Sequence, residues 1–451
     1  MNPIGEPVNI LVKMTNDALP SPAAINVTKI TPQDTLRDGV SEAEFCKIAS
    51  EEIFVPETIA VGYYTVRFDD DFMRAMLWRN FYDPYEWEWK DDRSRWDILD
   101  LVRMTRALRP EGIEWPFRED GAPTNRLELI TKLNGVSHEH AHDALSDVYA
   151  TIAVARLIRE KQPDLFDYLL SMRNKNEVKK LVNLDNKKPF VYASGRYANE
   201  FNKTTVVVPL TAGRNGNVLV YDLRYNLEEV LKQGSQESVS RGEKLLDESL
   251  ETEEQTESNF SPAALRFYSP STPVSKTYYP IVKELSLNRC PAVAPMGVLD
   301  KGDGWKKIGL TSELVEANLK TLLTHPEFAE QMRTQYENRP EFPPALEPEE
   351  AIYEGFLNDA DRVKVAAVRN AEPNKLADFH PEFDDERLPE LLLHYKGRNF
   401  PETLSEVEME KYEQYRLKRL ERQAPKFMEE IEKVTDDFVK EELLLYLQSL
   451  S

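Results

Sequence analysis

Three histidines and two aspartates share one short run whose spacing could support metal-dependent chemistry. The run SHEHAHDALSD holds His138, His140 and His142, followed by Asp143 and Asp147. Alternate histidines on a strand would project from one face and could bind a metal ion by themselves. A helix is nevertheless expected to begin at these aspartates, which places His142 near its N-terminus and Asp147 about one and a half turns further in. An aspartate there can hold a divalent metal ion while a histidine takes a proton from an attacking water. The alternative is a polar loop in which Asp143 only caps the helix.

A second acidic cluster, Asp69, Asp70 and Asp71, follows the apolar segment VGYYTVRF. A carboxylate at the end of a strand in an α/β sheet is a common position for metal and phosphate chemistry. The same acids could instead begin a helix, where the positive end of the helix dipole favours them. The residues alone leave both interpretations open.

The segment at residues 74–96 combines aromatic rings with cationic side chains. It contains four of the six tryptophans, interleaved with Arg74, Arg79, Lys90, Arg93 and Arg95. Bases of single-stranded nucleic acid stack on such rings for about 1–3 kcal/mol each, while cations follow the phosphates. Core packing is the competing interpretation, but Trp87 and Trp89 are spaced by two and flanked by charged residues, which makes them difficult to bury together.

Composition limits the class of protein. The chain has 451 residues, 57 Lys and Arg against 79 Asp and Glu, a formal net charge of −22, and 41% hydrophobic residues. An acidic chain is not coated with DNA-binding charge, yet it can still line one groove with cations. No apolar run approaches the roughly 20 residues that cross a bilayer, and no signal peptide pattern is visible at the start. Two distant cysteines make no disulfide framework. We therefore expect a cytoplasmic protein without a membrane partner.

Three compositional zones predict three domains. Residues 1–162 alternate strands with helices, which indicates an α/β domain. Residues 163–345 are rich in strand-like segments, with a polar, acidic insertion near 235–262, and residues 346–451 are helical. Within the first zone we expect strands at 8–13 and 57–66 and helices at 94–108, 126–133 and 142–162.

Several blocks together resemble the bacterial exonuclease I family of single-strand-specific 3′→5′ exodeoxyribonucleases. They include RFDDD, RNFYDPYEW, SRWDILDL, ALRPEGIEWP, HAHDALSDVYATIA and LNRCP, and the resemblance covers nearly the whole chain. It implies an RNase H-like exonuclease domain, an SH3-like β domain and a C-terminal helical domain that together enclose the substrate. It also implies processive hydrolysis of single-stranded DNA to 5′-mononucleotides in DNA repair and recombination.

The resemblance also implies roles for individual residues. The family's catalytic set is Asp-x-Glu, Asp, His, Asp, with two magnesium ions between the carboxylates and the scissile phosphate. By position in the matching motifs, Asp69 is the third carboxylate, Asp147 is the fourth carboxylate and a metal ligand, and His142 is the general base.

The family's Asp-x-Glu pair has no counterpart in the printed sequence. In the family this pair lies on the first strand of the sheet, upstream of the stretch that resembles NPIGEP, where this sequence begins. We expect either a start placed too far downstream or a natural truncation. A chain without that strand should bind magnesium poorly and catalyse little, because Mg²⁺ demands near-ideal oxygen coordination. It should also expose a sheet edge.

The resemblance implies a set of contacts with single-stranded DNA: Arg74, Tyr85, Trp89, Arg103, Arg126, Lys175, Lys283 and Asn288. It also implies that the C-terminal peptide of single-stranded DNA-binding protein docks at Arg109 and Lys188, for which ordinary surface charge is the alternative. We expect a monomer.

Two other functions stay open. A catalytically impaired DNA-binding or adaptor protein would keep the groove without the metal site. A metal hydrolase built on His138, His140 and His142 would bind zinc or manganese independently of Asp69.

Overall fold

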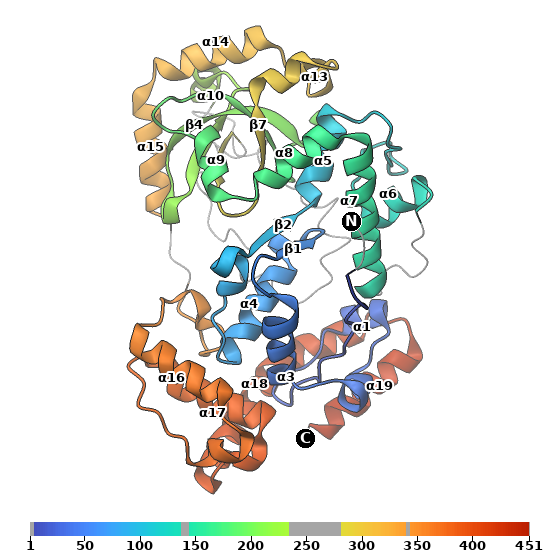
Figure 1. The fold of residues 1–451 in the computed structure, drawn as a ribbon, viewed down its shortest axis with the longest axis vertical. Helices are drawn as coiled ribbons and strands as arrows, with labels where there is room; N and C mark the ends of the chain where they lie inside the picture. The colour runs from blue at the N-terminus through green and yellow to red at the C-terminus, as the bar shows by residue number, and fades with distance from the viewer. Residues whose placement is uncertain (1–3, 137–143, 234–280, 340–342, 451) are drawn as a thin grey trace.

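The computed structural model describes residues 4–136, 144–233, 281–339 and 343–450. Its parts follow one another along the long axis of the molecule (Figure 1). A sheet surrounded by helices lies at one end, a small two-stranded sheet lies in the middle, and the C-terminal helices form the other end. The first helices of the chain pack against these C-terminal helices.

The α/β part, predicted above over residues 1–162 as an exonuclease domain and termed the exonuclease part, is built around two parallel strands. Strand β1 (Ile59–Gly62) pairs with β2 (Ser94–Asp97), with Gly62 opposite Asp97. The helix between them, α4 (Asp69–Arg79), makes the crossover that parallel pairing requires. Other helices of this part are α1 (Pro22–Thr28), α2 (Pro32–Asp38), α3 (Glu42–Ile48), α5 (Leu99–Leu108), α6 (Leu127–Leu133) and α7 (Ala144–Lys161).

The structure confirms some of these predicted elements and contradicts others. Helices α6 and α7 match the helices predicted at 126–133 and 142–162. The predicted strand at 8–13 is wrong, because the described residues there form only one isolated bridge, from Val12 to Val40. The helix predicted at 94–108 is wrong over its first four residues, which form β2. Pairing with β1, a partner distant in sequence, overrides the helical spacing of that segment.

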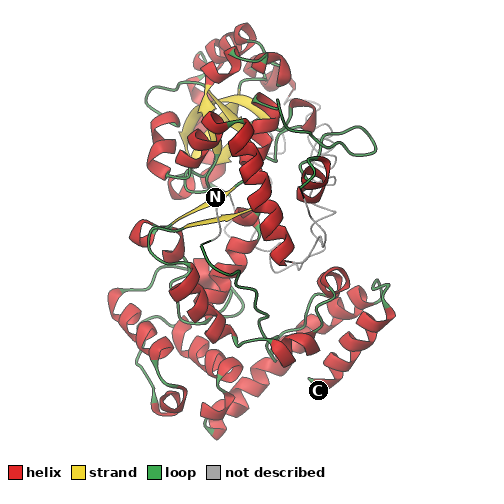
Figure 2. Ribbon diagram, turned by 45° about the vertical axis from the view of Figure 1, so that its right-hand side comes forward, coloured by secondary structure: helices red, strands yellow, loops and turns green. Residues whose placement is uncertain are grey.

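The β-rich part is a five-stranded antiparallel sheet in the order β6-β5-β4-β3-β7. Its strands are β3 (Phe190–Ala193), β4 (Thr204–Ala212), β5 (Val218–Asp222), β6 (Val282–Leu285) and β7 (Ala292–Pro295). Apolar residues on both faces are buried, because helices cover the sheet on each side (Figure 2). These are α8 (Pro163–Ser171), α9 (Lys175–Leu181), α10 (Leu227–Gln233), α13 (Gly304–Lys307), α14 (Ser312–Leu323) and α15 (Pro326–Glu337). The predicted insertion at 235–262 lies outside the described residues.

One hydrophobic core joins the sheet to the exonuclease part. Val102 of α5, Ile158 of α7 and Val208 of β4 belong to the same buried cluster. Burial of apolar surface is the main favourable term in such packing, so this core fixes the sheet relative to helices α5 and α7. No helix among the described residues is long and apolar enough to cross a membrane.

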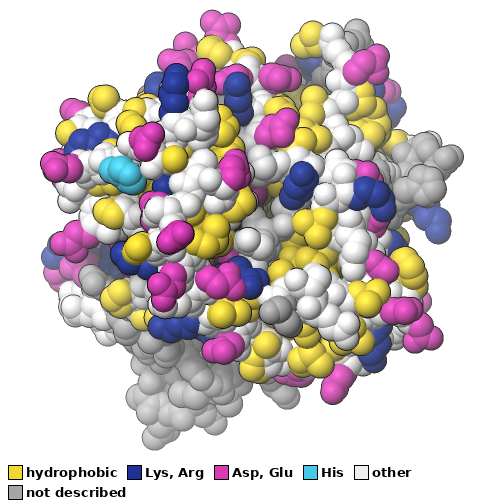
Figure 3. All heavy atoms as spheres, turned by 90° about the horizontal axis from the view of Figure 1, so that it is seen from below, with side chains coloured by type: hydrophobic (Ala, Val, Ile, Leu, Met, Phe, Trp, Pro, Cys, Tyr) yellow, Lys and Arg dark blue, Asp and Glu magenta, His cyan; other side chains and the backbone are white. Residues whose placement is uncertain are grey.

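The C-terminal part consists of α16 (Asp359–Asn370), α17 (Arg387–Asn399), α18 (Glu406–Ile431) and α19 (Asp437–Ser449). Trp78 and Phe81 of the exonuclease part pack into its core beside Val365 and Leu391. Acidic and basic side chains alternate on the face seen from its end (Figure 3). This pattern is typical of a solvated helical surface.

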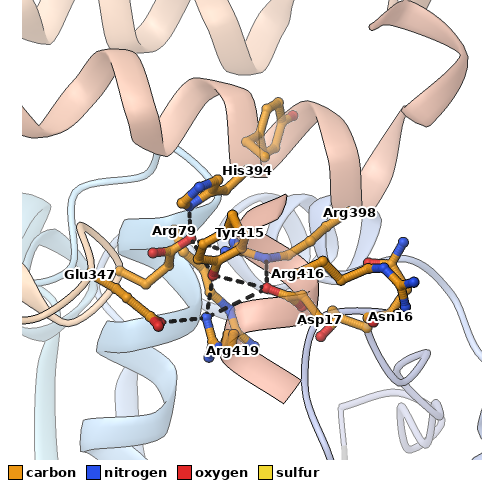
Figure 4. A network of polar contacts seen from close by, with 12 residues as sticks. Asn16, Asp17, Arg79, Glu347, His394, Arg398, Tyr415, Arg416 and Arg419 are labelled. Atoms are coloured by element: carbon orange, nitrogen blue, oxygen red, sulfur yellow. Dashed lines mark hydrogen bonds and ion pairs between the residues drawn. The ribbon is translucent and has the colours of Figure 1, made fainter. Parts of the chain in front are cut away.

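A buried polar network ties the N-terminal segment to the C-terminal helices (Figure 4). Arg398 Nε donates to Asp17 Oδ2 at 2.9 Å, and its Nη2 atom pairs with Glu349. Glu349 also contacts His394 Nδ1 at 2.7 Å, and His394 stacks on Tyr415 with ring centroids 3.5 Å apart. Burial in this network lowers the pKa of His394 to about 4, so the imidazole is neutral.

We expect His394 to make the stability of the protein depend on pH. Unfolded histidine takes up a proton near pH 6.5, whereas the folded residue stays neutral until about pH 4. The stability is therefore present above pH 6.5 and is lost as pH falls towards 4. Between pH 7.5 and 5 the loss from this residue is about 2 kcal/mol in the free energy of unfolding. In urea unfolding, the stability of His394→Gln should depend less on pH than that of the wild type. The control His380→Gln, at an exposed site, should keep the pH dependence of the wild type. An unchanged pH dependence in His394→Gln would contradict this account.

Candidate functional site

The carboxyl ends of β1 and β2 lie side by side, and the chain leaves β1 through a tight turn into α4. Tyr64 adopts a left-handed conformation with φ of 69°, and a short 3₁₀ helix at Thr65–Arg67 follows. Gly62 is required at the end of β1, because a Cβ there would lie 2.0 Å from Thr65 Cγ2. The turn delivers Asp69 as the first residue of α4.

Asp97 holds this turn in place from the end of β2. Its carboxylate accepts hydrogen bonds from the backbone N–H groups of Tyr64 at 2.9 Å, Val66 at 3.2 Å and Leu99 at 2.9 Å. A carboxylate that accepts several backbone N–H groups fixes their positions strongly. Asp97 therefore determines where Asp69 lies, and no motif in the sequence analysis identified it.

Asp69 is exposed, yet its electrostatic surroundings are unusual. Partial removal from water, together with repulsion from Asp97 and Asp147, raises the pKa of Asp69 to about 6. Burial also raises the pKa of Asp97. Asp147 lies in the first turn of α7. The fold thus brings Asp69 and Asp147 within electrostatic range of each other, as the resemblance implied, while His142 lies outside the described residues, as do His138 and His140.

Two of these carboxylates suit a divalent cation. Asp69 and Asp147 offer oxygen ligands of the type that Mg²⁺ prefers. Removal from water raises the pKa of Asp69 most, and the repulsion from neighbouring carboxylates that adds to it is relieved by a bound cation. Within the described ranges no group of three or more His, Cys, Asp or Glu side chains is arranged to hold a metal ion. The residues therefore fit part of a magnesium site.

The other two aspartates of the acidic run point inward and pair with arginines. Arg74 contacts Asp71 at 2.7 Å and Glu88 at 2.6 Å. Arg95 pairs with Asp70 and contacts Glu88 at 2.9 Å. All five side chains are almost fully buried. The helix-start interpretation of the run is confirmed, since all three aspartates lie in the first turn of α4, whereas β1 ends earlier, at Gly62.

A cleft of about 290 Å³ opens beside Asp97, between the exonuclease part and the five-stranded sheet. Six cationic side chains line it, namely Arg67, Arg103, Arg196, Lys283, Arg289 and Arg339, against the acids Asp97, Asp100 and Glu284. Such an excess of cations in a concave site attracts phosphate groups even when the net charge of the protein is negative. These side chains come from separate segments of the chain, so no local sequence motif shows that they converge.

Two predicted DNA contacts lie in this cleft. Arg103 pairs with Asp100 at 2.7 Å. Lys283 Nζ donates to Ser194 Oγ at 2.8 Å and lies 4.0 Å from the centre of the Tyr197 ring. Burial, together with nearby arginines, lowers the pKa of Lys283 well below its ordinary value.

The other predicted contacts lie elsewhere. Trp89 is 65% exposed, whereas Trp87 belongs to the core. The buried Arg74 lies 5.8 Å from the centre of the Tyr85 ring and supports it from behind. Lys175 begins α9 and is exposed, Asn288 is exposed on the loop after β6, and Arg126 contacts Glu128 at 2.5 Å.

The two residues predicted to bind a partner peptide differ in setting. Arg109 Nη2 donates to the carbonyl oxygen of Val298 at 3.0 Å, which joins the end of α5 to the β-rich part. Lys188 is exposed. Both roles stay predictions.

Comparisons with known proteins match every part of the chain. Family models match at residues 1–155 (exonuclease), 173–242 and 245–338 (exonuclease I SH3-like domain) and 346–451 (exonuclease I C-terminal domain). Exodeoxyribonuclease I of Haemophilus influenzae is 38% identical over 96% of this chain and 87% of its own length. That of Escherichia coli is 37% identical over 92% of this chain and 82% of its own.

Solved structures agree with these matches. E. coli exonuclease I in complex with a dA16 oligonucleotide has a TM-score of 0.85 and 33% identity, covering 100% of this chain and 93% of that one. An ExoI/SSB-Ct complex has a TM-score of 0.81 and 34% identity, covering 99% and 91%.

The pKa of Asp69 predicts a pH-dependent metal affinity. A protonated carboxylate does not coordinate, so Mn²⁺ binding should weaken about tenfold per pH unit at and below pH 6. Electron paramagnetic resonance of free Mn²⁺ measures this binding. Asp69→Asn should bind more weakly and lose the pH step, whereas Asp120→Asn, on an exposed loop, should bind as the wild type does. Affinity that is constant between pH 5 and 7.5 would contradict the assignment.

Proposed function

The chain belongs to the exodeoxyribonuclease I family, and we propose that it binds single-stranded DNA along the basic cleft and hydrolyses it processively from the 3′ end. The products would be 5′-mononucleotides, as expected for an enzyme of DNA repair and recombination. The observation that carries the proposal is the cleft itself, in which five arginines and Lys283 converge beside the turn that presents Asp69. In a chain of formal net charge −22, this local excess of positive charge has a specific use.

Each side chain at the site has a definite task in this proposal. Asp69 and Asp147 would hold the divalent cation, with His142 as the proton acceptor. Members of this family generally use Mg²⁺, which stabilises charge on the phosphoryl oxygens and activates water when it is bound. Asp97 fixes the turn before Asp69, and the pair of Arg95 with Asp70 anchors the first turn of α4.

The substrate contacts divide between charge and stacking. Arg103 and Lys283 would bind phosphates in the cleft, with Arg126, Lys175 and Asn288 as further contacts to the strand. Tyr85 and Trp89 would stack on bases, because the exposed face of an aromatic ring accepts any base. Arg74 is fully engaged by Asp71 and Glu88, so we assign it to supporting the Tyr85 ring.

An ExoI/SSB-Ct complex is among the similar structures. On that basis we propose that the acidic C-terminal peptide of single-stranded DNA-binding protein docks near Arg109 and Lys188. We also propose the domain boundaries 1–162, 163–345 and 346–451. A DNA-binding adaptor without catalysis is the second candidate, because the described carboxylates supply only part of a magnesium site.

Magnesium-dependent shortening of a 5′-labelled single-stranded oligonucleotide tests the proposal. The wild type should remove nucleotides stepwise from the 3′ end. Asp147→Asn should lose at least about 100-fold in rate, since one metal ligand stabilises several kcal/mol of transition-state charge. The matched control Asp120→Asn should retain full activity. Tight binding without shortening would favour the adaptor, and failure to bind single-stranded DNA would contradict both.

A further inference from the structure

Arg95 of β2 is a buried cation whose side chain contacts three separate segments of the chain. Its Nη1 atom pairs with Asp70 in the first turn of α4, and its Nε atom contacts Glu88 Oε2 at 2.9 Å. Its Nη2 atom donates to the carbonyl oxygen of Asn288 at 3.2 Å, on the loop between β6 and β7. Each nitrogen of one guanidinium therefore holds a different segment. Arginine suits this task because its donors form a rigid, planar fork.

Arg95 and Asp97 act on the two sides of Asp69. Residues two apart on a strand point to the same face of the sheet, so these two side chains share one face. Trp96, between them, belongs to the hydrophobic core. Asp97 fixes the turn before Asp69, and Arg95 holds the residue after it, Asp70. One strand thus sets the position of Asp69 from both directions.

The third partner of Arg95 belongs to the opposite wall of the cleft beside Asp97. Asn288 is exposed, and Arg289, the next residue, is exposed and lines that cleft. Cys290 Sγ donates to the carbonyl oxygen of Arg95 at 3.0 Å, so this loop is attached to β2 through a second contact. The separation between α4 and this wall therefore depends on Arg95.

Charge balance alone does not account for an arginine at this position. Burial lowers the pKa of Arg95 to about 10, so the side chain is still charged at neutral pH. Asp70 and Glu88 balance that charge. A lysine would balance them too, but its donors all lie on one nitrogen atom. It could not hold the Asn288 carbonyl oxygen and both carboxylates in the same arrangement.

We propose that Arg95 is a positioning residue that fixes Asp69 relative to the wall of the cleft formed by the loop around Asn288. The metal-binding carboxylate and the phosphate-binding wall then keep the separation that hydrolysis of a bound strand requires. Arg95 acts through Asp70 and the Asn288 carbonyl oxygen, without contact to the substrate. This inference rests on the proposed function, because Asp69 matters here as a ligand of the divalent cation. A displacement of about 1 Å at reacting groups can cost about 100-fold in rate.

Arg95→Lys tests the inference, because it keeps the positive charge and removes the fork. Mn²⁺ binding, measured by electron paramagnetic resonance, should weaken about tenfold, as expected when a residue that orients a metal ligand is changed. The kcat for shortening a 5′-labelled single-stranded oligonucleotide should fall about 100-fold. KM should stay within about threefold of the wild-type value, since the cations of the cleft remain.

Arg398→Lys is the matched control for a loss of stability. Arg398 is a buried arginine too, paired with Asp17 and Glu349 among the C-terminal helices. Both variants should lower the urea midpoint, but Arg398→Lys should bind Mn²⁺ as the wild type does. Wild-type Mn²⁺ affinity and kcat in Arg95→Lys would overturn the inference. An equal loss of Mn²⁺ affinity in both variants would also overturn it, because a general loosening of the fold would then explain the effect.

Asp70→Asn keeps the test decisive if Arg95→Lys does not fold. Asparagine has the same shape and still accepts a hydrogen bond from Arg95, so the change weakens the contact without emptying the site. Its Mn²⁺ affinity should fall about threefold, and wild-type affinity would overturn the inference. The double variant should bind Mn²⁺ no more weakly than Arg95→Lys alone, since both changes break one contact. Additive losses would contradict that shared contact.

The two measurements separate this inference from the proposed function. If the wild type binds Mn²⁺ but does not shorten the oligonucleotide, the proposed hydrolysis fails, and Mn²⁺ affinity still decides the role of Arg95. If the wild type shortens the oligonucleotide and Arg95→Lys does so at the same rate with the same Mn²⁺ affinity, only this inference fails.

Discussion

A buried ion pair between Asp17 and Arg398 constrains the rest of the structure. Asp17 belongs to the N-terminal segment and Arg398 to helix α17, and both side chains are 1% exposed. An isolated buried charge costs several kcal/mol, so the two groups must stay together. Arg398 also pairs with Glu349, and Arg419 contacts Glu347 at 2.9 Å. The C-terminal helices are thereby fixed against the exonuclease part. A hollow lined by Phe81, Tyr85, Ile352 and Phe356 depends on this attachment, since its two walls come from the two parts.

The same rule on buried charge organises the candidate site. Asp70 and Asp71 are buried, and each has an arginine partner, so they anchor the start of α4. Asp69 differs from these two residues because it is exposed. It faces solvent near Asp97 and Asp147, and partial removal from water, together with their repulsion, raises its pKa. One acidic run therefore divides into two structural residues and one residue whose charge is left for a ligand. Asp97 completes the division, because its hydrogen bonds to the turn decide which aspartate faces outward.

The position of the charged residues matters more for this protein than its net charge. The chain as a whole is strongly acidic, and the outer face of the C-terminal helices mixes both signs (Figure 3). Cations nevertheless dominate one cleft at the junction of the sheet with the exonuclease part. Long-range repulsion from the acidic surface disfavours nonspecific contact with nucleic acid, while the focused field of the cleft favours one strand in one path.

The sequence by itself determined the elements whose signals are local. Helices α6 and α7 follow from apolar spacing, and β4 lies in the zone of 163–345 that was predicted to be rich in strands. The family motifs also pointed to Asp69 and Asp147. Only the tertiary structure decided that 94–97 is a strand, that Trp87 is buried while Trp89 is exposed, and that Asp97 holds the turn. Four arginines of the cleft, Arg67, Arg196, Arg289 and Arg339, were likewise not identified from the sequence. The pairing of Tyr85 with Phe356 was also decided by the tertiary structure. The reason is physical: local propensity acts within a few residues, whereas burial, strand pairing and convergent charge depend on segments that meet only when the chain is folded.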